Sequence, residues 1–349
     1  MASASPEKIL VARGGALGDF ILTLPVLAAL RRRFPGRALE ILGYECIASL
    51  AVAGGLADRV AALESPALAG FFVRDGDWPV QAAEYFAGFE LIVSYVFDPE
   101  NIFQVNVARC STAQFLAGPH RPDESGKLHA TKVLLEPLES LGLGEFDLRP
   151  RLDLPGPVEV SSVPRFAVHP GSGGVRKNWP EVKWGELLQK LAAATEWNFL
   201  LIGGEAEGGR CERLAAALPP RRVRLAQNLP LVELAQRMRS CAAFLGHDSG
   251  VTHLAAALDL PMLVLWGPSN EIVWRPMSDR MRVLRDSRGL DALPVQRVLR
   301  AAQRLAARGN FRPAEPPLPL PNPTLNPPSI KIKIKSRIRN ERRHQPPEI

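Results

Sequence analysis

The sequence alternates short apolar runs with glycine-rich turns and helical patterns, and this alternation begins twice. The first unit has an apolar strand at Lys8–Arg13, a turn at Gly14–Asp19 and a helix over Phe20–Arg33, followed by a second strand at Ala38–Leu42. A strand, a helix and another strand in succession are typical of a parallel sheet covered by helices. The sequence therefore predicts an α/β fold, and the same alternation restarts at residue 165.

Proline-rich composition separates the two halves. Residues 149–164 contain four prolines and few large apolar side chains, which is typical of a linker. We expect an α/β domain over 1–150, a linker over 151–164 and a second α/β domain over 165–308, with a ligand cleft between them. Further strands are expected at Val60–Leu63, Leu91–Val96, Arg165–His169, Asn198–Ile202, Cys241–Leu245 and Pro261–Trp266, and further helices at Lys127–Leu141 (kinked or shortened by Pro137), from Pro180, and at Glu207–Leu218, Leu231–Arg239, Val251–Leu258 and Val295–Ala307.

The last residues differ in composition from the rest. Residues 309–349 are rich in proline and then alternate basic and apolar residues, so we expect a disordered tail. Eight Lys/Arg and three Asp/Glu follow from Arg312 onward, so most of the net charge of +7 lies in this tail. The remaining charge gives no indication of a nucleic-acid-binding domain. A weak contact of the tail with a membrane surface or RNA stays open.

The sequence also excludes several classes of protein. The longest apolar run is well short of the roughly 18 residues of a membrane span, and the first residues have no apolar signal segment. The four cysteines lie far apart without a C-x-x-C pair, which is typical of a reducing compartment and argues against structural zinc. We expect a cytoplasmic protein without a metal site.

The stretch Gly246–His253 is the clearest indication of an anion site. It follows an apolar strand and leads into an alanine-rich helix, so Gly246–Gly250 is predicted to be a strand-to-helix turn. Free backbone N–H groups and the positive end of the helix dipole favour a phosphate there, and glycines let it approach closely. Asp248 and His253 flank this position. The alternative is that Asp248 or Ser249 only caps the helix.

Three other segments carry candidate residues. The loop that begins at His169 has three glycines and two cations before a helix, which suits a diphosphate, with Ser172, Gly173 and Lys177 as candidate ligands. Glu205 follows a strand and could bind sugar or ribose hydroxyl groups. Surface loops are the alternative for both. Asp19, at the first turn, either accepts a proton from a hydroxyl group or caps a helix.

Three patterns resemble known catalytic or metal-binding motifs but do not match them. The serine in Gly246–Gly250 is one position too late for a G-x-S-x-G nucleophile turn. Asp75 and Asp77 resemble a D-x-D metal clasp, but they lie beside Trp78-Pro79 in an expected loop. The histidines at 169, 247 and 253 lack metal-ligand spacing, so we expect neutral, hydrogen-bonded or core roles for them.

Taken together, the motifs resemble those of glycosyltransferase family 9, the ADP-heptose–lipopolysaccharide heptosyltransferases. The resemblance covers about Lys8 to Arg308 and leaves out the tail. Each motif alone is weak, and their order and spacing carry the resemblance. The motifs are RGGALGD ending at Asp19, HPGSG beginning at His169, KNWP beginning at Lys177, GGE ending at Glu205, HDSGVTH beginning at His247, and LWGP beginning at Leu265.

The resemblance implies the GT-B fold, with two Rossmann-like domains facing a cleft, and inverting sugar transfer without a metal or cofactor. The acceptor would bind the N-terminal half, and the nucleotide-sugar donor, such as ADP-heptose, would bind the C-terminal half. Asp19 would be the general base, and Lys177 would contact the donor phosphates. Glu205 would lie near the ribose, and the donor-binding turn would comprise Asp248, Ser249, Gly250 and His253.

The acceptor is less clearly indicated. Residues 64–127 lack the dense Lys/Arg clustering expected for a phosphorylated lipid-A core, so a lipopolysaccharide-core acceptor and another glycolipid or oligosaccharide both stay open, as does a peripheral contact with the inner membrane face. Two further alternatives are a sugar-nucleotide epimerase of the same fold and a non-catalytic protein that binds through its basic tail. The candidate acceptor-binding cations are Arg13, Arg109, Arg121 and Lys127, with Lys132 nearby.

Overall fold

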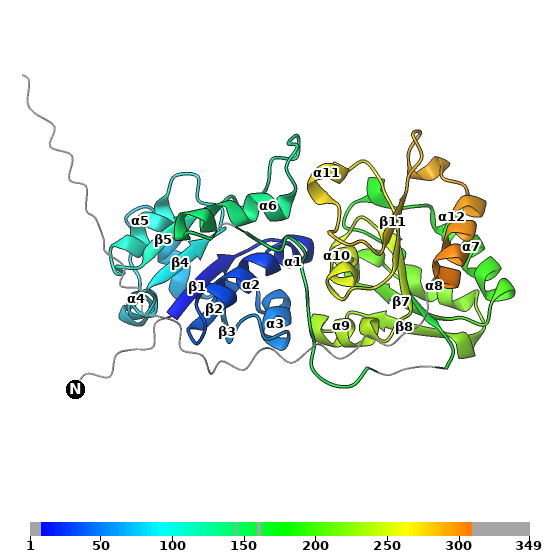
Figure 1. Ribbon diagram of the computed structural model, residues 1–349, viewed down its shortest axis with the longest axis horizontal. Coiled ribbons are helices and arrows are strands. Elements are labelled where there is room, and N and C mark those ends of the chain that lie inside the picture. The colour runs from blue at the N-terminus through cyan, green and yellow to red at the C-terminus, as the bar shows by residue number, and fades with distance from the viewer. Residues whose placement is uncertain (1–7, 144, 159–161, 309–349) are drawn as a thin grey trace, which may run out of the picture. The chain divides into compact units, whose positions relative to one another are not determined.

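The computed structural model describes residues 8–143, 145–158 and 162–308, so the tail predicted over 309–349 lies outside the described residues (Figure 1). Two parallel sheets are present in the described part, one before residue 118 and one after residue 164. This confirms the predicted α/β class with two separate parallel sheets. The domain boundaries themselves stay predictions.

The first sheet has five parallel strands in the order β3-β2-β1-β4-β5. The central strand β1 is buried on both faces: Ile9 and Val11 join a core that includes α2, while Leu10 and Ala12 join a core that includes α4 and α5. Continuous apolar runs are typical of such parallel strands. The strands are β1 (Lys8–Arg13), β2 (Ala38–Gly43), β3 (Arg59–Ala62), β4 (Leu91–Ser94) and β5 (Gln114–Ala117).

Helices connect these strands. Both helices predicted for this half differ from the prediction, and the helices at Glu45–Ala53, Val80–Ala87 and Ile102–Ala108 were not predicted. The helix expected over Phe20–Arg33 is divided before Pro25, because proline is tolerated only in the first turn of the new helix. The helix expected over Lys127–Leu141 begins at Ala130 and continues as a 3-10 helix that contains Pro137. The helices are α1 (Leu17–Ile21), α2 (Leu24–Arg33), α3 (Glu45–Ala53), α4 (Val80–Ala87), α5 (Ile102–Ala108) and α6 (Ala130–Leu135), with 3-10 helices η1 (Pro66–Phe72) and η2 (Glu136–Leu141).

The segment around residues 149–158 has no helix or strand, as expected of a linker. It is nevertheless packed. Leu152 and Leu154 are buried, and the N–H of Leu152 donates to the carbonyl of Ala257 at 2.9 Å. The side chain of Leu152 also fills the space that a side chain on Gly54 would need. The linker is therefore anchored to both halves of the chain.

The second sheet has six parallel strands in the order β11-β10-β9-β6-β7-β8. Its inner strands are the predicted ones. The strands are β6 (Arg165–His169), β7 (Asn198–Gly203), β8 (Val223–Gln227), β9 (Ala243–His247), β10 (Met262–Leu265) and β11 (Met281–Leu284).

The short helix Glu271–Trp274 was not predicted, and the predicted helices of this half lie close to their expected positions with one exception. The helix expected over Glu207–Leu218 is split, because Gly208 and Gly209 adopt positive φ values of 50° and 76°. The helices are α7 (Glu181–Ala194), α8 (Arg210–Ala216), α9 (Leu231–Arg239), α10 (Gly250–Ala257), α11 (Glu271–Trp274) and α12 (Val295–Arg308), with 3-10 helices η3 (Val175–Lys177), η4 (Glu205–Glu207), η5 (Pro220–Arg222) and η6 (Leu290–Ala292).

Parallel pairing places the carboxyl ends of β7, β6, β9 and β10 at one edge of the second sheet. The loops that follow these strands therefore meet, and they contain the residues singled out in the sequence. Among the helices of the described residues, none combines the length and apolar character needed to cross a bilayer.

Candidate active site

The turn after β9 is the centre of the site in the second half. Ser249 is the N-cap of α10, and its Oγ accepts the N–H of Thr252 at 3.4 Å. Capping by Ser249 was one of the two interpretations of this turn, and it does not exclude the other. The first N–H groups of a helix have no partner within the helix, so those of Gly250 and Val251 remain suited to an anion.

Lys177 reaches this turn from the loop after β6. Its Nζ lies 2.8 Å from Oδ2 of Asp248, although the two residues are far apart in the sequence. The Asp248 side chain is 6% exposed and that of Lys177 is 39% exposed, so the ammonium group is held in place and still accessible to a ligand. The structure thus brings a cation and a helix N-terminus together at one point.

His247, the last residue of β9, holds the same loop in place through two hydrogen bonds. It is fully buried; its Nε2 accepts the backbone N–H of Trp179 at 2.8 Å, and its Nδ1 donates to the carbonyl of Gly171 at 3.2 Å. Burial lowers the pKa of His247 to about 3, because the charged imidazolium would be desolvated. The side chain is therefore neutral and structural, as the sequence predicted.

The other loop residues divide into buried and exposed. Ser172 is buried and donates to the carbonyl of Gly174 at 3.1 Å, whereas Gly173 and Glu205 are exposed. Besides Asp248, a second buried carboxylate lies beside these loops: Glu207, which the sequence analysis did not single out. One of its carboxylate oxygens accepts the N–H of Gly204 at 2.6 Å.

Glu207 also interacts with His169. Its Oε1 lies 3.5 Å from Nε2 of His169, and Nδ1 of His169 lies 3.2 Å from Oγ of Ser249. Burial acts to raise the pKa of Glu207, but the hydrogen bonds from His169 and the N–H of Gly204 act against it, and the pKa is lowered. Glu207 is therefore an ionised carboxylate that contacts the turn of α10 through His169.

In the first half, Arg13 and Asp19 lie together after β1. Arg13 is buried; it donates to the carbonyl groups of His120 at 2.7 Å and Asp19 at 3.1 Å, and its Nη2 lies 4.0 Å from Oδ1 of Asp19. Oδ2 of Asp19 accepts the N–H of Ala16 at 3.1 Å. Asp19 therefore caps the first turn with one oxygen and presents the other beside a cation.

The turn with Asp19 and the turn with Ser249 approach each other through glycines. A Cβ atom on Gly250 would lie 3.0 Å from the backbone nitrogen of Gly18, and one on Gly18 would lie 3.3 Å from Cδ2 of His253. Side chains at these positions would push the two turns apart. Burial lowers the pKa of His253, although Asp248 acts to raise it, so this histidine is neutral between the turns.

The remaining candidate cations do not join this cluster through their described contacts. Arg109 follows α5, donates to the carbonyl of Gly76 and to Oδ1 of Asn106, and lies 4.4 Å from the ring centre of Trp78. Arg121 is exposed and pairs with Glu124 at 2.8 Å, and Lys127 is exposed. Within the described part of the chain, no three or more His, Cys, Asp and Glu side chains are grouped to hold a metal ion.

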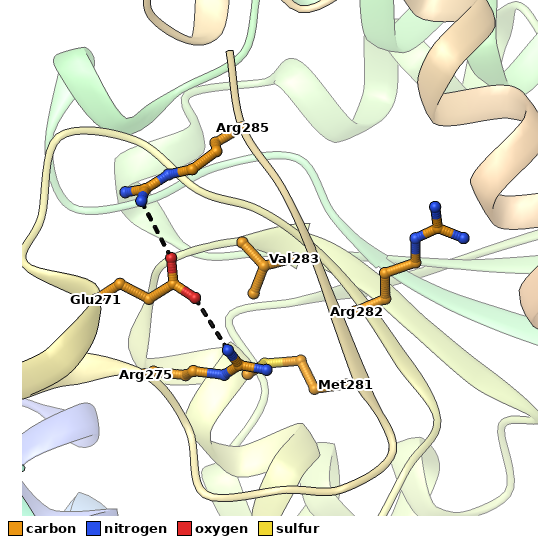
Figure 2. Close-up of a pocket in the computed structure, with 6 residues that line it drawn as sticks. All are labelled: Glu271, Arg275, Met281, Arg282, Val283 and Arg285. Carbon is orange, nitrogen blue, oxygen red and sulfur yellow. Dashed lines mark hydrogen bonds and ion pairs between the residues drawn. The ribbon is translucent and has the colours of Figure 1, made fainter. Parts of the chain in front are cut away.

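A surface hollow of about 550 Å³ lies beside the edge strand β11, away from the predicted residues (Figure 2). Figure 2 shows Glu271 between two arginines, 3.1 Å from Arg275 and 3.3 Å from Arg285, while Arg282 points elsewhere. The carboxylate offsets part of the positive charge. None of the sequence-predicted site residues lines this hollow.

Comparison with known proteins gives matches in both sequence and structure. Residues 139–297 match the sequence model of "Glycosyltransferase family 9 (heptosyltransferase)". Lipopolysaccharide heptosyltransferase 1 of Pseudomonas aeruginosa is 40% identical over 101 residues, which are 29% of this chain and 28% of that protein. Lipopolysaccharide heptosyltransferase 2 of Salmonella typhimurium is 31% identical over 130 residues, 36% of this chain and 37% of that protein. The matches thus span less than a third of the first relative and little more than a third of the second.

Solved structures match over a longer range. The ADP-heptose lipopolysaccharide heptosyltransferase II of E. coli has a TM-score of 0.70 at 18% identity, over 86% of this chain and 98% of that one. E. coli heptosyltransferase WaaC with ADP has a TM-score of 0.66 at 19% identity, over 86% of this chain and all of that one. At such identities the likeness establishes the fold, which is the predicted GT-B type.

Proposed function

We propose that this chain, whose residues 139–297 match the model of glycosyltransferase family 9, transfers heptose, or a related sugar, from a nucleotide-sugar such as ADP-heptose to a glycan. The acceptor would be the lipopolysaccharide core or a related cell-surface glycan, met at the cytoplasmic face of the inner membrane. Transfer would invert the anomeric centre without a metal ion. The observation that carries the proposal is the approach of Gly18 to Gly250, which joins the Asp19 turn to the turn of α10.

The second half has the chemistry for a diphosphate. Lys177 supplies a positive charge, and the first N–H groups of α10 supply hydrogen-bond donors at the positive end of a helix. Charge on the departing diphosphate would be stabilised by both, and these groups are already in place before reaction. E. coli WaaC, which shares the fold, has been solved with ADP.

The first half has the chemistry for a general base. Asp19 is 19% exposed in its side chain, and only Oδ2 is occupied by a backbone N–H. Oδ1 would accept the proton of the acceptor hydroxyl group as the hydroxyl oxygen bonds to the anomeric carbon. The bond from that carbon to the diphosphate breaks in the same step, and its electron pair leaves with the nucleoside diphosphate. Arg13 is too buried to meet an acceptor and would act by holding Asp19.

Asp19→Asn tests the proposal directly. Asparagine keeps the shape and can still accept the N–H of Ala16, but it cannot take a proton. We expect turnover to fall by roughly 10²- to 10⁴-fold, while the affinity for ADP, measured by calorimetry, stays at the wild-type value because the donor is held by the other half. Near-normal turnover would mean that Asp19 only caps α1, and lost ADP binding would mean that the donor site lies elsewhere. Asp153→Asn, at an exposed linker position, is the matched control.

A further inference from the structure

We propose that Glu207 and His169 are positioning residues that fix the donor turn through Ser249. The proposal rests on the proposed function, because it takes the turn of α10 as the place where the donor diphosphate binds. We refer to these three residues as the polar triad. His169 is the last residue of β6, and Glu207 and Ser249 follow β7 and β9, the two strands that flank β6 in the sheet.

The polar triad is built of buried groups in a definite order. The side chains of His169 and Glu207 are 6% and 5% exposed, and they meet at 3.5 Å. His169 then contacts Oγ of Ser249 at 3.2 Å. Burying a carboxylate and an imidazole lowers the stability of the folded protein unless both groups are hydrogen-bonded. The contacts among these three residues supply such hydrogen bonds.

The polar contacts of the triad lead from Glu207 to the start of α10. Glu207 is ionised, so Nε2 of His169 carries a proton that points to it. Nδ1 of His169 lies 3.2 Å from Oγ of Ser249, so the ring bridges the carboxylate of Glu207 and the hydroxyl group that caps α10. The hydroxyl group of Thr252 donates to the carbonyl of His247 and supplies no proton to Ser249. Oγ of Ser249 also accepts the N–H of Thr252 and caps α10.

This inventory changes the role predicted for Ser249. Its Oγ lies 3.2 Å from both Nδ1 of His169 and Oγ1 of Thr252 and accepts the N–H of Thr252, so the side chain is occupied within the protein. Ser249 instead holds the start of α10, where the backbone N–H groups that face a ligand begin. The triad therefore acts on the donor indirectly, by keeping those N–H groups aimed.

Glu207 also holds the loop that carries Lys177. A Cβ atom on Gly171 would lie 2.0 Å from Oε1 of Glu207, so the carboxylate packs directly against the backbone of Gly171. Arg210, three residues later, donates to the carbonyl of Pro170 at 3.0 Å. One short segment after β7 thus fixes both the loop of Lys177 and the turn of α10. Their relative position decides whether one diphosphate can contact both.

Glu207→Gln tests the triad with little change in size. The carboxylate accepts hydrogen bonds from two donors, the N–H of Gly204 and Nε2 of His169. In glutamine the amide oxygen can accept only one of these hydrogen bonds, and the NH₂ group is placed against the other donor. We expect ADP to bind about tenfold more weakly, which corresponds to about 1.4 kcal/mol. The KM for the donor should rise and the KM for the acceptor should not. A purely structural role would reduce the amount of folded enzyme and leave the affinity for ADP unchanged. Glu212→Gln, exposed on α8, is the control.

A double-mutant cycle with Ser249→Ala gives the decisive measurement. Glu207 and Ser249 are linked through His169, so coupling between them requires the triad. We expect each single variant to weaken ADP binding and the double variant to be no worse than the weaker single variant. Effects that multiply, or an affinity of Ser249→Ala equal to that of wild type, would overturn the proposal, and the latter holds even if Glu207→Gln does not fold. If wild type itself binds no nucleoside diphosphate, the proposed function fails instead.

Discussion

Mild acid should destabilise this protein through His247. Its pKa lies at about 3 in the folded protein, against an ordinary value of 6.5, because the ring is completely buried. The unfolded chain therefore binds a proton that the folded chain refuses, and the stability contributed by the neutral ring is complete above pH 6.5 and is lost as the pH falls below it. A pKa difference of one is worth about 1.36 kcal/mol, so lowering the pH from 6.5 to 5 should cost about 2 kcal/mol.

Other groups do not reverse this sign. Burial also lowers the pKa values of His129 and His253, so they add to the loss in the same interval. The lowered pKa values of Glu181 and Glu207 add stability that is lost only near and below the ordinary glutamate value of 4.5. The interval between pH 5 and pH 7.5 therefore reports on the buried histidines.

Urea unfolding followed by tryptophan fluorescence is a suitable assay, because the ring of Trp184 lies 5.3 Å from that of His247. His247→Gln should be less stable than wild type at pH 7.5, since the contact with Gly171 is lost, but its stability should depend less on pH by about 2 kcal/mol between pH 7.5 and 5. His120→Gln, at an exposed position, should keep the wild-type dependence. An equal dependence in His247→Gln and wild type would refute the reasoning.

Three other substitutions have defined expected outcomes. Lys177→Ala should weaken ADP binding and slow transfer together, because its charge acts on the bound diphosphate and more strongly on the departing one; unchanged ADP affinity would place Lys177 outside the donor site. Gly171→Ala should lower the free energy of unfolding by about 1–3 kcal/mol, since the new Cβ would meet Glu207. Gly173→Ala has open space around its Cβ and should be nearly neutral, so equal melting temperatures for these two variants would contradict the packing described.

The inner strands of both sheets could be predicted from the sequence, and several edge strands could not. β1, β4, β6, β7, β9 and β10 are buried and apolar throughout most of their length, which makes them visible as runs. β5, β8 and β11 lie at sheet edges and expose part of their residues, so their apolar pattern is broken. Their pairing with a neighbour strand defines them, and pairing cannot be read from a short segment.

Several candidate residues of the second half could be picked out from the sequence because they follow strands. Lys177 and Asp248 both follow inner strands that end at one edge, so their contact is a consequence of the topology. Glu207 was missed because the predicted helix began there and Glu205 lay closer to the strand. The spacing of Gly204 and Glu207 was the available signal, since an acidic residue three positions after a helix start can reach back to the backbone N–H.

The contact of Gly18 with Gly250 could not be predicted by any local pattern. Each glycine has a sufficient explanation in its own turn, one at the start of α1 and one at the start of α10. In the structure both glycines also allow the two turns to approach each other. Neither position has room for a side chain, because the other turn lies beside it. Under the proposed function, this close approach decides the reaction. A base at Asp19 can activate a hydroxyl group for transfer only if that hydroxyl also lies close to the anomeric carbon, which the diphosphate at Lys177 would hold in place. The two glycines allow the turns, and therefore these groups, to come close together.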